Sequence, residues 1–75
     1  MNLEDFIAKF REQFEDTNPD QIQFDTDYKG LDEWSSMMAL IIIAFVDEEY
    51  NVTLKGDSFA STTSVEDLFN LISIK

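Results

Sequence analysis

The feature that most constrains the fold is an uninterrupted apolar run, residues 37–46, which follows a pair of serines and precedes an acidic segment. Ser35 and Ser36 stand where a helix N-cap is expected, and Asn51 suits a left-handed residue at a helix end. The run is far shorter than the ~20 residues that a membrane-spanning helix requires. The sequence therefore predicts a helix that begins at Ser35 or Ser36 and continues to about Tyr50.

This predicted helix is apolar on nearly all sides, and its periodicity assigns two faces. The face expected to turn toward the core consists of Ala39, Leu40, Ile42, Ile43, Val46 and Tyr50. The opposite side then carries Met38, Ile41, Ala44 and Phe45. In a small domain such an apolar strip is either a contact surface or is covered by the long loop, and the sequence leaves both possibilities open.

Three further helical segments are expected. Residues 3–15 show the stripe of an amphipathic helix, with Asn2 as its N-cap and apolar positions Leu3, Phe6, Ile7, Phe10 and Phe14. Residues 57–60 fit one short helical turn. The last helix begins with a capping box that pairs either Thr63 with Glu66 or Ser64 with Asp67. Its inner face is expected to contain Val65, Leu68, Phe69, Leu71 and Ile72.

A long connection separates the first two helices. Pro19 ends the first helix, and the alternating segment 21–24 has no partner strand elsewhere in the chain. We therefore expect an extended loop that holds Ile22 and Phe24 against the helices. Its own packing residues are expected to be Tyr28, Leu31 and Trp34.

Within this loop, residues 25–30 imitate the start of a calcium-binding EF-hand loop. Lys29 stands at the fifth position, and Ser36 occupies the twelfth, where a bidentate glutamate is required. A solvated acidic turn is the better interpretation, and no metal site is expected. The predicted fold is thus a single all-α domain over residues 1–75, a small four-helix bundle with a long first loop and a short third helix.

Charge and composition exclude several classes of function. The chain has 16 acidic and 5 basic residues, a net charge of −11, so nucleic acid and anionic membranes are repelled while a basic protein partner is attracted. Cysteine and histidine are absent, which excludes a thiolate zinc site and a Ser-His nucleophile pair. The start of the sequence lacks the basic region of a secretory signal, so we expect a cytoplasmic protein. Carboxylates are the only candidate acid-base groups, so we do not expect an enzyme, and we expect the protein to be a monomer.

Several segments together resemble the acyl carrier protein family, over nearly the whole chain. The family's hallmark is Asp-Ser-Leu at the start of its second helix and an acidic-aromatic pair at the end of that helix. The matching residues here are Ser35-Ser36-Met37 and Glu49-Tyr50. An extended form of the motif is similar to Tyr28, Leu31 and Trp34, and the segments 50–54 and 62–68 are similar to later parts of the family pattern.

The resemblance implies that Ser36 is esterified by the phosphate of 4′-phosphopantetheine, whose thiol carries acyl groups as thioesters. A phosphopantetheinyl transferase would attach this arm, and acyl-loading and acyl-transferring enzymes would do the chemistry. The acid of the family motif is replaced by Ser35, which is therefore the second candidate for attachment. The spacing to Tyr50 favours Ser36.

The resemblance also implies a partner surface and an acyl-binding space. Partner enzymes with basic and apolar docking patches are expected to contact Met37, Met38, Ile41, Phe45, Asp47 and Glu48. The acyl chain is expected to fold back among Val46, Tyr50, Leu54, Phe59, Leu68 and Ile72, which are otherwise ordinary core residues. Fatty acyl, polyketide, aminoacyl and D-alanyl cargoes all remain open. The alternative is an acidic helical interaction adaptor without a prosthetic group.

Overall fold

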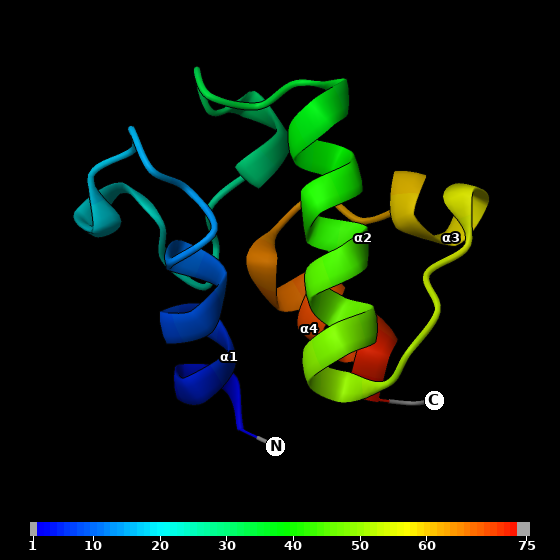
Figure 1. The fold of residues 1–75 in the computed structure, drawn as a ribbon. Coiled ribbons are helices and arrows are strands. Elements are labelled where there is room, and N and C mark those ends of the chain that lie inside the picture. The colour runs from blue at the N-terminus through cyan, green and yellow to red at the C-terminus, as the bar shows by residue number, and fades with distance from the viewer. Residues whose placement is uncertain (1, 74–75) are drawn as a thin grey trace.

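The computed structural model describes residues 2–73, and within them the chain forms four α-helices and no β-strand. The helices are α1 (Leu3–Arg11), α2 (Ser36–Tyr50), α3 (Gly56–Ala60) and α4 (Val65–Ser73), and the first loop contains the 3₁₀ turns η1 (Pro19–Gln21) and η2 (Tyr28–Gly30). In Figure 1, α2 stands at the centre with α1 on one side, α3 on the other and α4 behind. The predicted all-α class, long first loop and short third helix are confirmed.

Helix α1 is capped as predicted but is shorter than predicted. Asn2 Oδ1 accepts a hydrogen bond from the Asp5 backbone N–H at 2.8 Å. The helix ends at Arg11 rather than at residue 15, because the next N–H groups, of Gln13 and Phe14, bond to carbonyls three residues back. The chain therefore tightens into 3₁₀ geometry, which is common at helix ends. Phe14 nevertheless remains buried.

Aromatic rings connect α1 to the other helices. The ring centroid of Phe6 lies 6.0 Å from that of Phe45 and 5.7 Å from that of Tyr50, both in α2. The same centroid lies 5.6 Å from that of Phe69 in α4. Phe10 continues the packing into the first loop, where its centroid is 5.5 Å from that of Tyr28. The buried side chains of all four helices and the loop consequently form one core cluster.

The predicted orientation of α2 is wrong for three residues. Met38 and Phe45 were expected on the outer side but are only 6% and 5% exposed, whereas Leu40, expected in the core, is 67% exposed. The cause is the position of α1, whose rings cover the side of α2 that carries Phe45. Met37 and Ile41 are exposed, as predicted.

The first loop packs largely as expected. Ile22 and Tyr28 are fully buried, and Leu31 and Trp34 are partly buried against the core. Phe24 is the exception, since its side chain is 50% exposed. Here the backbone makes the contact instead: the carbonyls of residues 24 and 26 accept hydrogen bonds from the N–H groups of Glu66 and Val65 at 2.9 and 3.2 Å. The loop thereby satisfies donors at the start of α4, which a helix leaves unpaired.

The helix ends use the predicted caps. Ser64 and Asp67 form the capping box: Ser64 Oγ accepts from the Asp67 N–H at 3.1 Å, and Asp67 Oδ2 accepts from the Ser64 N–H at 3.2 Å. This selects one of the two predicted registers. Asn51 ends α2 with φ 56° and ψ 39°, the left-handed conformation predicted for it.

Candidate functional site

The two serines at the start of α2 have different roles. Ser35 is the N-cap: its backbone is extended, and its Oγ accepts a hydrogen bond from the Met38 N–H at 3.2 Å. Ser36 is the first residue of the helix, and its side chain is exposed. Among the hydrogen bonds of residues 2–73, none involves the Ser36 hydroxyl. One hydroxyl is therefore engaged in capping, and the other is available to solvent.

The backbone at the start of α2 suits an anion. The first turn of a helix leaves backbone N–H groups without intrahelical acceptors, and the Ser35 side chain satisfies only that of Met38. The positive end of the helix dipole lies at the same place. The first turn of α2 has no acidic residue that would oppose a phosphate. A phosphodiester on Ser36 would thus meet free backbone donors and the positive end of the helix dipole.

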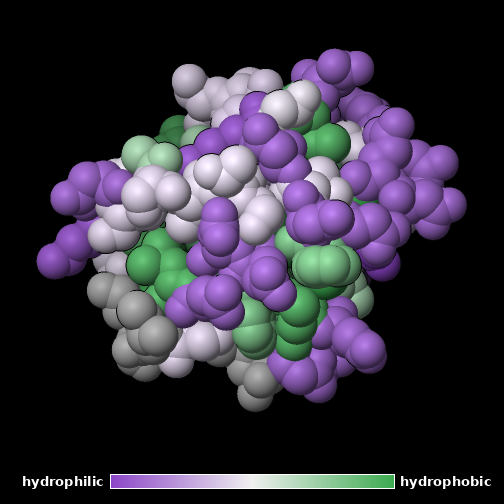
Figure 2. All heavy atoms as spheres, turned by 180° about the vertical axis from the view of Figure 1, so that it is seen from behind, coloured by the Kyte–Doolittle hydropathy of each residue, from purple (hydrophilic) through white to green (hydrophobic). Residues whose placement is uncertain are grey.

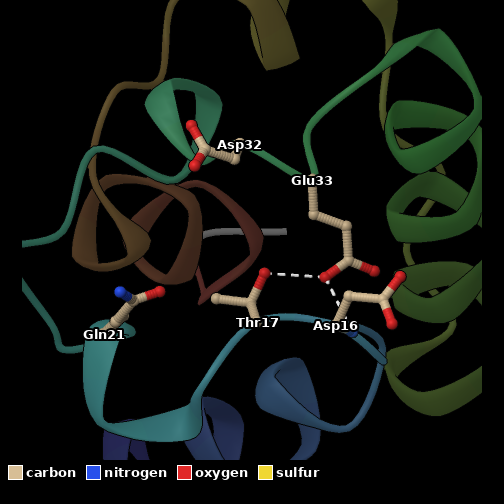
Figure 3. Close-up of a pocket in the computed structure, with 5 residues that line it drawn as sticks. All are labelled: Asp16, Thr17, Gln21, Asp32 and Glu33. Carbon is tan, nitrogen blue, oxygen red and sulfur yellow. Dashed lines mark hydrogen bonds between the residues drawn. The ribbon is translucent and has the colours of Figure 1, made fainter.

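Glu33 fixes the chain just before this helix. Its Oε1 accepts hydrogen bonds from the Asp16 N–H at 3.1 Å and the Thr17 hydroxyl at 2.7 Å, and its Oε2 accepts from the Glu15 N–H at 3.1 Å. Figure 3 shows the Glu33 carboxylate directed at Thr17 and Asp16. The start of the long loop is thereby tied to the segment that leads into α2.

A polar hollow of about 310 Å³ lies beside this contact, lined by Asp16, Thr17, Gln21, Asp32 and Glu33. The Asp32 carboxylate points away from that of Glu33 (Figure 3). The hydrogen bond from Thr17 and those from the backbone lower the pKa of Glu33, because they stabilise its charged form. No group of three or more metal-binding side chains is found among residues 2–73. The three hydrogen bonds that Glu33 accepts hold the start of the loop against the segment before α2.

Only four of the six residues predicted to contact partners are exposed. Met37, Ile41, Asp47 and Glu48 are exposed, whereas Met38 and Phe45 belong to the core, so the prediction for these two is wrong. Leu40 is exposed beside Met37 and Ile41, although its position in the pattern predicted a core residue. The signal was weak because α2 is apolar on nearly all sides, and its pattern does not define one inner face.

The residues predicted to line an acyl-binding space lie in one buried cluster. Five of them are buried, namely Val46, Leu54, Phe59, Leu68 and Ile72. Tyr50 is partly buried against the cluster. Its hydroxyl is shielded from solvent and has no hydrogen-bond partner in the described part of the chain. Burial raises the pKa of Tyr50, and the charges of Glu49 and Asp5 raise it further.

None of the helices within residues 2–73 has the length and apolar character needed to cross a bilayer. Comparison of the chain with protein-family models, with curated proteins and with solved structures finds no match.

Proposed function

We propose that this protein is a carrier protein of the acyl-carrier type, with 4′-phosphopantetheine attached to Ser36. The observation that supports the proposal is that only one of the two serine hydroxyls is used for helix capping. Ser35 Oγ is engaged with the Met38 N–H, while Ser36 presents a free hydroxyl at the N-terminus of the longest helix. A hydroxyl at this position can become a phosphodiester without the loss of a helix cap.

The same geometry accounts for the departure from the family motif. Aspartate and serine are both good N-cap residues, since each offers an oxygen to an N–H of the first turn. Ser35 performs this capping here. The substitution therefore keeps the helix start intact while it removes a negative charge next to the attachment point. We infer that the transferase for this protein does not require that charge.

In this proposal the protein supplies a scaffold and the partners supply the chemistry. Acyl groups would be carried as thioesters on the arm and presented to enzymes of fatty-acid, polyketide or related biosynthesis in the cytoplasm. Aminoacyl and D-alanyl cargoes fit the same scaffold. An acyl chain that enters between the helices would have to displace buried side chains such as Val46, Phe59 and Leu68 from their mutual packing.

Intact-mass analysis after incubation with coenzyme A and phosphopantetheinyl transferases tests the proposal. The wild-type chain and Ser35→Ala are expected to gain one phosphopantetheine, and Ser36→Ala is expected to gain none. Ser35→Ala is the matched control, because it removes the neighbouring hydroxyl and loosens the helix cap but keeps the attachment point. Modification of Ser36→Ala but not of Ser35→Ala, or no modification by transferases of broad and narrow specificity, would contradict the proposal.

The exposed apolar residues of α2 favour a second candidate, an interaction adaptor without a prosthetic group. Met37 and Leu40 are 71% and 67% exposed on the helix that bears the serines. Stable complexes of the unmodified protein in cells, undisturbed by Ser36→Ala, would favour this candidate over the carrier.

A further inference from the structure

A hollow of about 300 Å³ lies between the start of α2 and the segment that follows α1. Ser35 and Met37, the neighbours of Ser36 on either side, both line it. The hollow therefore begins at the proposed attachment point. We call it the Ser35 hollow.

One wall of the Ser35 hollow is apolar and consists of Met37, Met38 and Ile41. Met37 and Ile41 are 71% and 37% exposed, whereas Met38 is only 6% exposed, so the wall extends from solvent to the edge of the core. Apolar surface that is left in water favours contact with another apolar group. Such a group can bind to this wall without displacing a core side chain.

The other side of the hollow offers hydrogen-bond acceptors. Gln13 Nε2 donates to the Lys9 carbonyl at 3.0 Å, and Gln13 Oε1 has no donor within residues 2–73. The exposed Glu15 carboxylate likewise makes no hydrogen bond or ion pair in the described part of the chain. The lining residues that the structure describes include no basic side chain. A suitable occupant therefore carries N–H or O–H donors and apolar groups, and is not an anion.

The pantetheine part of the proposed arm has this chemistry, because it is uncharged and combines amide N–H groups and a hydroxyl with methyl and methylene groups. A volume of about 300 Å³ is at the lower end of the range for small-molecule sites, which suits a small group. Attachment to Ser36 would also hold the arm at an effective concentration on the order of millimolar, so contacts too weak to retain a free ligand are sufficient.

Other apolar areas lack this continuity with Ser36. Seen from behind, the molecule shows hydrophobic side chains in separate areas between hydrophilic ones (Figure 2). A second recess, of about 350 Å³, is lined by Leu3, Ile7 and Phe24 among others, and no residue of α2 lines it.

We propose that the Ser35 hollow binds the pantetheine part of the arm when no partner enzyme holds it. Gln13 Oε1 and the Glu15 carboxylate accept hydrogen bonds from its amide N–H groups, and Met37 and Ile41 contact its methyl and methylene groups. The inference rests on the proposed function, since the arm is attached to Ser36. It adds a resting site for the arm on the α1 side of α2.

Nuclear magnetic resonance of the labelled protein, before and after modification, tests the inference. Intact mass first establishes that Ser36 carries the arm. The amide signals of residues 13–15, 33 and 38–41 are then expected to shift, and isotope-filtered spectra are expected to show nuclear Overhauser effects between the arm and the Met37 methyl group.

Two variants with matched controls separate binding in the hollow from a general disturbance. Ile41→Gln and Gln13→Ala are each expected to reduce the shift changes of the remaining hollow residues by about half or more. Leu40→Gln, at an exposed position of the same helix outside the hollow, and Glu12→Ala, next to Gln13, are expected to leave them unchanged. Circular dichroism confirms that each variant is folded.

The outcomes distinguish this inference from the proposed function. A protein that gains no arm contradicts both. An attached arm that shifts only residues 35–37, or that shifts residues 56–61 of α3 and its end on the other side of α2, overturns the resting site alone. Equal effects of Ile41→Gln and Leu40→Gln also overturn it.

Discussion

The ammonium group of Lys29 donates a hydrogen bond to the backbone carbonyl of Phe59 at 2.8 Å and lies 5.0 Å from the centre of the Phe59 ring. The same group donates to the carbonyls of Ala60 and Thr62 at 3.2 and 2.8 Å. These carbonyls belong to the C-terminal end of α3 and the link that follows it, where a helix leaves acceptors unpaired. A residue of the first loop thus caps the shortest helix.

We predict that Lys29→Met lowers the free energy of unfolding by about 2 kcal/mol, because three carbonyls lose a charged donor. Lys55→Met, which removes the same charge from an exposed position, is expected to change it by less than about 0.5 kcal/mol. Urea unfolding followed by circular dichroism measures both. Equal effects of the two substitutions would show that net charge, and not the cap, determines the loss.

A substitution at Tyr50 is expected to stabilise the fold. Its hydroxyl is shielded from solvent and unpartnered in the described part of the chain, which costs free energy without a compensating hydrogen bond. Tyr50→Phe is therefore expected to raise the free energy of unfolding, by up to about 1 kcal/mol, while the ring contacts with Phe6 and Phe45 remain. Thermal unfolding measures the change. A lower midpoint for this variant would mean that the hydroxyl has a partner in solution.

Tyr28 is the matched comparison for Tyr50, because its ring is fully buried but its hydroxyl is hydrogen-bonded to Thr62. The Thr62 hydroxyl donates to the Phe59 carbonyl at 2.8 Å, so the Tyr28 hydroxyl is the donor to Thr62. Tyr28→Phe is expected to lower the free energy of unfolding by about 1 kcal/mol at neutral pH. An increase, as expected for Tyr50→Phe, would contradict this account.

The same residue predicts a loss of stability in alkali. Burial, with smaller contributions from the charges of Asp67 and Asp27, raises the pKa of Tyr28 from 10.0 to about 12. Between these values the unfolded chain releases the phenolic proton and the folded protein keeps it, so stability falls as pH rises from 10 toward 12. Urea midpoints across this range measure the slope. Tyr28→Phe should flatten it, and an unchanged slope in this variant would exclude Tyr28 as the cause.

The sequence predicted those parts of the fold that depend on local signals. Asn2, Ser35, Asn51 and the pair Ser64–Asp67 each cap a helix where expected, because capping requires particular residue types at fixed offsets. The buried phenylalanines of α1 were predictable for a similar reason, since that helix has a clear apolar stripe.

The orientation of α2 was not predictable in the same way. With apolar residues on nearly every side, its inner face is decided by where α1 packs, and this is a long-range property. The exposed Leu40 and the buried Met38 and Phe45 follow from that packing. The Lys29 cap and the Tyr28–Thr62 contact likewise join residues distant in sequence, so no local sequence pattern predicts them. Spacing alone favoured Ser36 over Ser35 as the proposed attachment point, and the structure adds that the Ser35 side chain caps α2.

The high negative charge predicts a strong response to salt. With a net charge of −11, repulsion between carboxylates destabilises the folded chain, and screening by salt reduces that repulsion. We expect the thermal midpoint to rise as sodium chloride increases from about 0.02 to 0.3 M, over which the Debye length shortens severalfold. A flat or falling midpoint would show that attractive ion pairs, such as Lys9 with Glu49, outweigh the repulsion.

The lowered pKa of Glu33 determines how the loop before α2 is expected to respond to acid. Its folded pKa is lowered from 4.5, chiefly by the hydrogen bond from Thr17, so its contribution to stability is present above pH 4.5 and is lost as pH falls through the folded value. Glu33→Gln is therefore expected to lower the urea midpoint at pH 7 and to converge with the wild type in acid.

Asp32→Asn, next to it but without these bonds, is the control. Because Glu33 precedes the Ser35 cap, loss of its bonds should also shift the amide signals of residues 15–17 and 34–38. A gap from the wild type that stays constant down to pH 3 would show that lost packing, and not the charge of Glu33, is responsible.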